Sequence, residues 1–283
     1  MNALEIKDLT KHYPDFSLDR LSLTLPGGCV LGLIGENGAG KTTTLRLILD
    51  MLHRDGGSIT ILGKDNRENL PLTKQDIGVV FDEVGIPGCL NARQVGKIMA
   101  LTYKNWDSRR YQECLKTFSL PEKKRFQDYS RGMKMKLGLA VALSHKARLL
   151  LLDEATSGLD PVARDQVVDI LLDFARQGDN AVLISSHIVS DLEKLCDYIA
   201  FIHKGDLLFC EEKDQLLEQY GIFEDSRENL DCLQPEAIVA REESRYGGVR
   251  ALVKRDLAPT GFRLEKPTVE DVVLFLVKGA KNR

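Results

Sequence analysis

Two kinds of apolar segment along the chain predict two kinds of β-strand. Residues 4–9 and 21–25 alternate apolar and polar positions with a period of two, which is typical of half-exposed antiparallel strands. Residues 30–34, 149–152 and 181–184 are continuously apolar, as buried parallel strands are. Because helical patterns separate these segments, we expect an α/β fold with a mostly parallel sheet and an antiparallel β subdomain.

Helix signals divide this core. Asp160 is suited to be an N-cap and Pro161 to be the first helical residue, so we expect a helix there that packs against the sheet. Residues 86–120 show two helical patterns and no strand pattern. We therefore predict an inserted helical subdomain at about residues 86–145. Residues 198–211 predict a β-hairpin.

The last quarter of the chain has a different pattern. It begins as an acidic, turn-prone stretch, continues with an alternating segment at residues 249–254, and ends in a helix that Thr268 opens. Asp271 completes a capping box for that helix. We expect a main domain at residues 1–217 and a small C-terminal accessory region at residues 218–283.

Composition excludes several classes of protein. The 283 residues are 43% apolar and 29% charged, which rules out a disordered chain. The longest run without a charge, residues 21–35, is too short to cross a bilayer. The first residues lack the layout of a signal peptide, and the six cysteines show no CxxC spacing, so we expect reduced thiols and a cytoplasmic protein. A net charge of −3 gives no general attraction to nucleic acid.

A phosphate-binding loop follows the first buried strand. The sequence matches GxxxxGK followed by Ser or Thr, between a strand pattern and a helix pattern, which makes a plain glycine-rich turn a poor alternative. The matching residues are Gly35, Glu36, Asn37, Gly38, Ala39, Gly40, Lys41 and Thr42. Backbone N–H groups of such a loop surround a β-phosphate at the positive end of the next helix. We expect Lys41 to bridge the β- and γ-phosphates, Thr42 to be a Mg²⁺ ligand and Thr43 to contact the α-phosphate.

Two carboxylates end the second buried strand. Asp153 should emerge at the carboxyl edge of the sheet, where open α/β sheets bind ligands, and we expect it to hold Mg²⁺. Glu154 is then placed to polarise the attacking water as a general base. The alternative is a pair of acids that only ends a strand.

Five motifs together resemble an ATP-binding cassette (ABC) ATPase domain. They occur in the family's order at residues 35–42, 129–133, 149–154, 157–160 and 186–187, and the resemblance covers residues 4–217. It implies a P-loop NTPase core with an inserted helical subdomain. It also implies that two copies of the cassette sandwich two molecules of ATP.

The resemblance assigns roles to further residues. Tyr13 matches the aromatic that stacks on adenine, and His187 matches the switch histidine that contacts the γ-phosphate, although either residue alone could be structural. Ser157 and Asp160 match the loop that couples the two sites of the dimer. Four residues match the LSGGQ signature, which caps the ATP of the opposite subunit. They are Ser130, Arg131, Gly132 and Met133.

The chain departs from the family at three positions. Arg131 stands where glycine is usual, and Met133 stands where glutamine is usual. Asp82 stands at the position of the Q-loop glutamine. A carboxylate there could approach Mg²⁺, but unlike an amide it cannot donate a hydrogen bond.

The resemblance implies an ATP-hydrolysing subunit that dimerises on Mg²⁺ and ATP. It would drive a separate membrane permease from the cytoplasmic face, as a homodimer or with a second ABC subunit, and its motifs are similar to those of bacterial drug and lantibiotic exporters. One alternative is an ABC ATPase that acts on ribosomes or DNA, but the chain has no second phosphate loop and no long insertion between Lys41 and Ser130. Another, a GTPase or kinase, leaves the signature residues unexplained.

Overall fold

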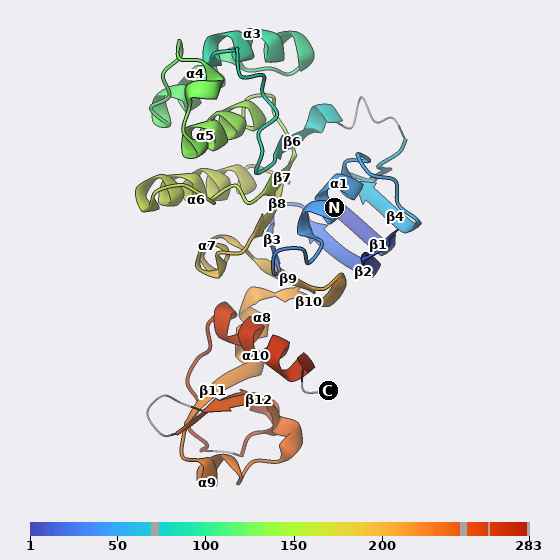
Figure 1. Cartoon of the computed structure of the whole chain (residues 1–283), viewed down its shortest axis with the longest axis vertical. Helices are drawn as coiled ribbons and strands as arrows, with labels where there is room; N and C mark the ends of the chain where they lie inside the picture. The colour runs from blue at the N-terminus through green and yellow to red at the C-terminus, as the bar shows by residue number, and fades with distance from the viewer. Residues whose placement is uncertain (69–73, 244–247, 260, 282–283) are drawn as a thin grey trace. The chain divides into compact units, whose positions relative to one another are not determined.

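A computed structural model describes residues 1–68, 74–243, 248–259 and 261–281. The chain forms two compact units, Met1–Cys210 and Glu211–Arg283 (Figure 1). The first unit ends at Cys210, somewhat earlier in the chain than the boundary at residue 217 that the sequence suggests.

A six-stranded sheet is the centre of the first unit. Its order is β10-β9-β3-β8-β7-β6, and the strands from β9 to β6 run parallel. The strands are β3 Val30–Ile34, β6 Ile77–Val80, β7 Leu149–Asp153, β8 Ala181–Ser186, β9 Tyr198–His203 and β10 Asp206–Glu212. All residues of β3, β7 and β8 are buried, which confirms the prediction from their continuously apolar segments.

A second sheet in this unit is antiparallel. Its order is β2-β1-β4-β5. The strands are β1 Asn2–Tyr13, β2 Phe16–Pro26, β4 Gly56–Ile61 and β5 Lys64–Asp65. Burial alternates along β2, as the period-two pattern predicts for a strand that has one face on the core.

Three helices, α3, α4 and α5, gather beside the β6 edge of the parallel sheet (Figure 1). The helices of the unit are α1 Lys41–Ile48, α3 Ala92–Thr102, α4 Ser108–Thr117, α5 Arg131–Ala142, α6 Pro161–Ala175 and α7 Val189–Leu195, with 3₁₀ turns at Lys74–Asp76 and Phe126–Asp128. The two helices predicted between residues 86 and 120 are confirmed. So is the start of α6, because the Asp160 side chain accepts a hydrogen bond from Ala163 N at 3.0 Å.

The second unit is built on a three-stranded antiparallel sheet of order β11-β13-β12, and α10 packs on β12 and β13. Its elements are α8 Lys213–Gln219, β11 Tyr220–Asp225, α9 Arg227–Leu230, β12 Ile238–Glu243, β13 Val249–Lys254 and α10 Val269–Lys281, with 3₁₀ turns at Pro235–Ala237 and Arg255–Leu257. The capping box of Thr268 and Asp271 is present, with hydrogen bonds of 3.0 and 3.1 Å. Strands β11 and β12 lie in the stretch that the sequence describes only as acidic and turn-prone.

Among the residues that the structure describes, no helix has both the length and the apolar character that crossing a membrane requires.

Candidate functional site

The phosphate loop lies at the carboxyl end of β3. Gly38 and Gly40 have φ angles of 80° and 114°, a region that favours glycine, and Gly40 is the N-cap of α1. A Cβ atom on Gly35 would lie 2.5 Å from the carbonyl oxygen of Ile202, so the loop fits against β9 only with glycine there. Asn37 is exposed, and Thr42 and Thr43 are half-buried.

Lys41 points back into this loop. Its Nζ donates hydrogen bonds to Gly35 O at 2.7 Å and to Glu36 O at 3.3 Å, and the residue is only 6% exposed. The same ammonium lies 3.7 Å from a carboxylate oxygen of Glu154. The predicted phosphate-binding cation and the predicted general base are therefore neighbours in one site.

A chain of hydrogen bonds fixes Asp153. Thr42 Oγ1 donates to Asp153 Oδ2 at 2.8 Å, and Ser185 Oγ donates to Asp153 Oδ1 at 2.6 Å. The carboxylate is buried, at 3% exposure, so these two donors replace the water that it has lost. No sequence motif marks Ser185; its only signal is that it is a polar residue at the end of an otherwise apolar strand segment.

Glu154 and His187 are in direct contact. His187 Nδ1 lies 2.6 Å from Glu154 Oε2. The backbone N–H of Glu154 is hydrogen-bonded to Ser185 O at 3.1 Å, although Glu154 has a φ of 53°, which non-glycine residues rarely adopt. The structure thus brings together the four predicted residues Lys41, Asp153, Glu154 and His187.

Tyr13 lies at the end of β1 and is exposed. Its ring centroid is 6.3 Å from that of Phe16, and Lys11 Nζ lies 5.5 Å from it. A Cβ atom on Gly40 would lie 3.0 Å from Phe16 Cζ, so Phe16 packs against the phosphate loop. No sequence motif marks Phe16 as part of this site.

The signature residues begin α5. Ser130 is the N-cap, and its hydroxyl accepts a hydrogen bond from Met133 N at 3.3 Å. Ser130 and Arg131 are exposed, while Gly132 and Met133 are half-buried. No hydrogen bond between described residues joins this segment to the phosphate loop.

Arg131 instead contacts two other candidate residues. Its Nη2 donates to Asp82 Oδ1 and lies 3.5 Å from Ser157 Oγ. The carboxylate of Asp82 is thus paired with a cation, and no hydrogen bond between described residues links Asp82 to Thr42 or Asp153. A metal-binding role for Asp82 stays a prediction.

Asp160 follows Ser157 at the start of α6. The hydrogen bond from Ala163 N lowers the pKa of Asp160 below its ordinary value of 3.8. Its carboxylate is therefore ionised at neutral pH and available at the surface.

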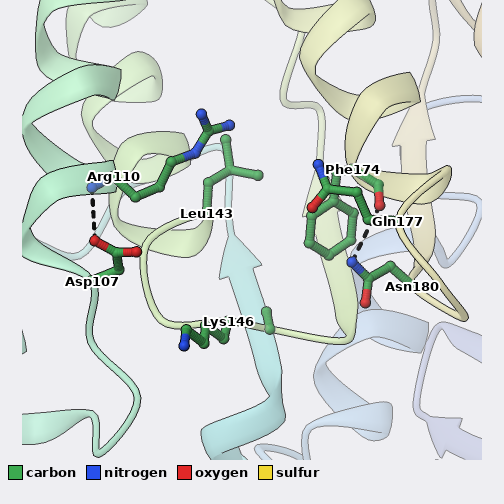
Figure 2. A pocket seen from close by; sticks show the side chains of 8 residues that line it. Asp107, Arg110, Leu143, Lys146, Phe174, Gln177 and Asn180 are labelled. Carbon is green, nitrogen blue, oxygen red and sulfur yellow. Dashed lines mark hydrogen bonds between the residues drawn. The ribbon is translucent and has the colours of Figure 1, made fainter.

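A different cavity, of about 310 Å³, lies at the amino edge of the parallel sheet (Figure 2). Ala147 and Asn180, which line it, come just before β7 and β8. Its polar groups already serve the fold, since Asp107 caps α4 and Asn180 Nδ2 donates to Phe174 O at 3.2 Å. It contains none of the predicted site residues, which lie at the carboxyl edge.

Comparison with known proteins agrees with this geometry. The ABC transporter family model matches residues 18–157. The chain is 36% identical to the bacitracin transport ATP-binding protein BcrA of Bacillus licheniformis over 212 residues, which cover 72% of this chain and 68% of that protein. It is 33% identical to the lantibiotic transport ATP-binding protein SrtF of Streptococcus pyogenes over 215 residues, which cover 75% of this chain and 91% of that protein.

Solved structures share the fold. An ATP-binding subunit of an ABC transporter aligns with a TM-score of 0.71 at 25% identity, covering 77% of this chain and 92% of that chain. A dimeric ATP-binding cassette bound to ADP and Pi aligns with a TM-score of 0.68 at 20% identity, covering 74% and 98%. These likenesses confirm the predicted ABC ATPase fold. The chain therefore belongs to the family of ABC transporter ATP-binding subunits, and it is an ATPase.

Proposed function

We propose that two copies of this chain close on two molecules of Mg²⁺-bound ATP and drive a separate membrane permease that exports its cargo. The observation that supports this most directly is the single cluster of Lys41, Glu154 and His187 beside the phosphate loop, with Lys41 and Glu154 3.7 Å apart. Such a cluster combines phosphate binding with a base for water attack.

The residues at the loop suit Mg²⁺. Thr42 Oγ1 and Asp153 Oδ2 are hard oxygen ligands only 2.8 Å apart, of the kind that this ion prefers, and these two residues would hold it. When bound, Mg²⁺ neutralises charge on the β- and γ-phosphate oxygens. Asp82, which the sequence suggests as a further ligand, has its carboxylate paired with Arg131 in this structure.

The chain's own residues divide the remaining work. Lys41 and the loop N–H groups bind the phosphates, and Glu154 accepts the proton of the attacking water. His187, hydrogen-bonded to Glu154, orients that carboxylate and contacts the γ-phosphate. Tyr13 stacks on the adenine.

The exposed signature supports a dimer. Ser130 and Arg131 face outward at the N-terminus of a helix, where the helix dipole favours an anion. One chain carries both a hydrolytic cluster and a signature. A symmetric homodimer therefore has two equivalent sites, each formed by the hydrolytic cluster of one copy and the signature of the other. A second ABC subunit in place of one copy is the alternative.

An apolar groove supports a permease partner. It has a volume of about 340 Å³, and Phe81 and Glu83, the residues on either side of Asp82 in the sequence, line it. Its apolar lining includes Met51, Phe81, Val84 and Tyr103, and Met51 is exposed. We propose that a cytoplasmic segment of the permease docks here, which places the protein at the cytoplasmic face of the membrane. Export agrees with the relatives, which are named for transport of bacitracin and lantibiotics.

Replacement of the general base tests the hydrolytic site. We expect Glu154→Gln to lower kcat by about 10²- to 10⁴-fold, because the base is lost, while ATP binding persists. The ATP-bound dimer should then accumulate and be visible by size-exclusion chromatography with light scattering.

The matched control is Glu113→Gln, because Glu113 is an exposed residue of α4 that pairs with Arg109 at 3.1 Å. This variant should hydrolyse ATP like the wild type. Rapid turnover by Glu154→Gln would contradict the assignment of the base, and an ATP-bound monomer would contradict the dimer.

The groove has its own test. Met51→Lys places a charge in the apolar docking surface, so a multi-span membrane protein that co-purifies with the tagged chain should be lost, with ATPase activity of the isolated chain retained. Undiminished co-purification would exclude the groove as the docking surface.

A further inference from the structure

Asp82 and Arg131, two of the departures from the family motifs, are in contact with each other. Asp82 follows β6, and Arg131 is the first residue of α5. The Nη2 group of Arg131 donates a hydrogen bond to Asp82 Oδ1. The two unusual residues therefore form one ion pair that joins the loop after β6 to the signature helix.

A third segment meets the same side chain. Arg131 Nη2 lies 3.5 Å from Ser157 Oγ. A Cβ atom on Gly158 would lie 3.2 Å from Arg131 Cδ, so the stem of the arginine packs directly on that glycine. Both ends of the side chain are thus held, the stem by Gly158 and one terminal nitrogen by Asp82 and Ser157.

The electrostatics of α5 explain why an acid is needed. The helix has no acidic residue in its first turn, and its N-terminus carries Arg131 and, one turn later, Lys134. The helix dipole repels cations at this end. Asp82 supplies from another element the negative charge that the first turn lacks.

The ion pair leaves most of the guanidinium group free. Between described residues, no hydrogen bond uses Nε or Nη1 of Arg131, and the side chain is 58% exposed. An open cavity of about 480 Å³ beside it is lined by Asp82, Phe126, Arg131 and Lys134, among others. An anion that approaches α5 would therefore meet free donors of an arginine whose position is already fixed.

We propose that Asp82 is a positioning residue: it holds Arg131 so that the free guanidinium nitrogens bind the γ-phosphate of the ATP carried by the second copy. This inference rests on the proposed ATP-bound dimer. An exposed ion pair adds little stability by itself. Its value here is that it removes the entropy cost of ordering a long side chain when the dimer closes.

The experiment measures the dimer dissociation constant at saturating Mg²⁺ and ATP, in full-length protein that carries Glu154→Gln. We expect Asp82→Asn to raise the dimer dissociation constant about tenfold. A symmetric dimer has two Arg131–phosphate contacts, and the loss of affinity at each should be about threefold, which is within the range of exposed ion pairs. Asp82→Glu should restore most of the affinity. Arg131→Met should weaken the dimer at least as much as Asp82→Asn does.

The double variant separates positioning from a structural role. If Asp82 acts through Arg131, Asp82→Asn has no further effect in the Arg131→Met background. An equal effect in both backgrounds, or no effect in either, would overturn the inference. Glu113→Gln, at the exposed acid of α4 that pairs with Arg109, is the control and should leave the dimer dissociation constant unchanged. Failure of the Glu154→Gln parent to dimerise at all would instead contradict the proposed function.

Discussion

The two sides of the proposed ATP site differ in how many of their polar groups are satisfied within one chain. The phosphate side is formed by residues 35–43 with Asp153, Glu154 and His187, and the signature side by residues 130–133 and 157–160. On the phosphate side, Thr42 and Ser185 hydrogen-bond the buried carboxylate of Asp153. On the signature side, Ser130, Arg131 and Asp160 are exposed.

This difference follows from desolvation. A buried carboxylate without partners is costly, so the phosphate side must satisfy its polar groups inside the chain. The signature side keeps its donors in water until a ligand arrives. A site of this kind is ready to bind ATP on one side, and its other side is suited to meet the ATP of another molecule.

Loss of Ser185 should weaken the phosphate side. Ser185→Ala removes the donor that lies 2.6 Å from Asp153 Oδ1 and leaves that buried oxygen without its partner. We expect kcat/KM to fall about tenfold, a loss typical of an unsatisfied buried acceptor, and the Mg²⁺ concentration needed for half-maximal activity to rise. A Mg²⁺ titration of the ATPase rate measures both.

A second buried serine gives the matched control. Ser144 is fully buried, and its hydroxyl donates to Ala140 O at the end of α5. Ser144→Ala should lower the melting temperature without changing the Mg²⁺ titration. If the two variants show the same Mg²⁺ dependence, Ser185 supports only the fold.

The phosphate side could be predicted from the sequence because its information is local. Residues 30–34 and 149–152 are unbroken apolar segments, and each runs directly into its functional residues. The edge at which they meet then follows from the parallel order of the strands. Ser185 was missed because its role depends on the pairing of β8 with β7, which sets it opposite Asp153.

Contacts between distant segments could not be predicted from the sequence, because they too depend on how the strands and helices pack. Asp82 and Arg131 each appear as an isolated departure from a motif, and only the packing of α5 against β6 brings them together. In the second unit, β12 (Ile238–Glu243) has three charged residues among its six, so its apolar signal is weak. Pairing with β13 makes it a strand.

A change at Asp160 should give the smallest effect and test the signature side. Asn is as good an N-cap as Asp, so Asp160→Asn keeps the hydrogen bond to Ala163 N and removes only the charge. Because that hydrogen bond lowers the pKa of Asp160, the stability from its ionised form is complete at neutral pH and is lost only as the pH falls below about 3.8. Measurements at pH 7 therefore compare a full charge with none.

If Asp160 couples the two sites, Asp160→Asn should reduce the Hill coefficient for ATP hydrolysis toward one, and it should lower the melting temperature less than loss of the whole N-cap does. Asp160→Ala also removes the N-cap and should lower the melting temperature as well. A wild-type Hill coefficient in Asp160→Asn would show that the residue only caps α6. Arg131 and Ser157 would then be the next residues to replace, because their contact does not involve Asp160.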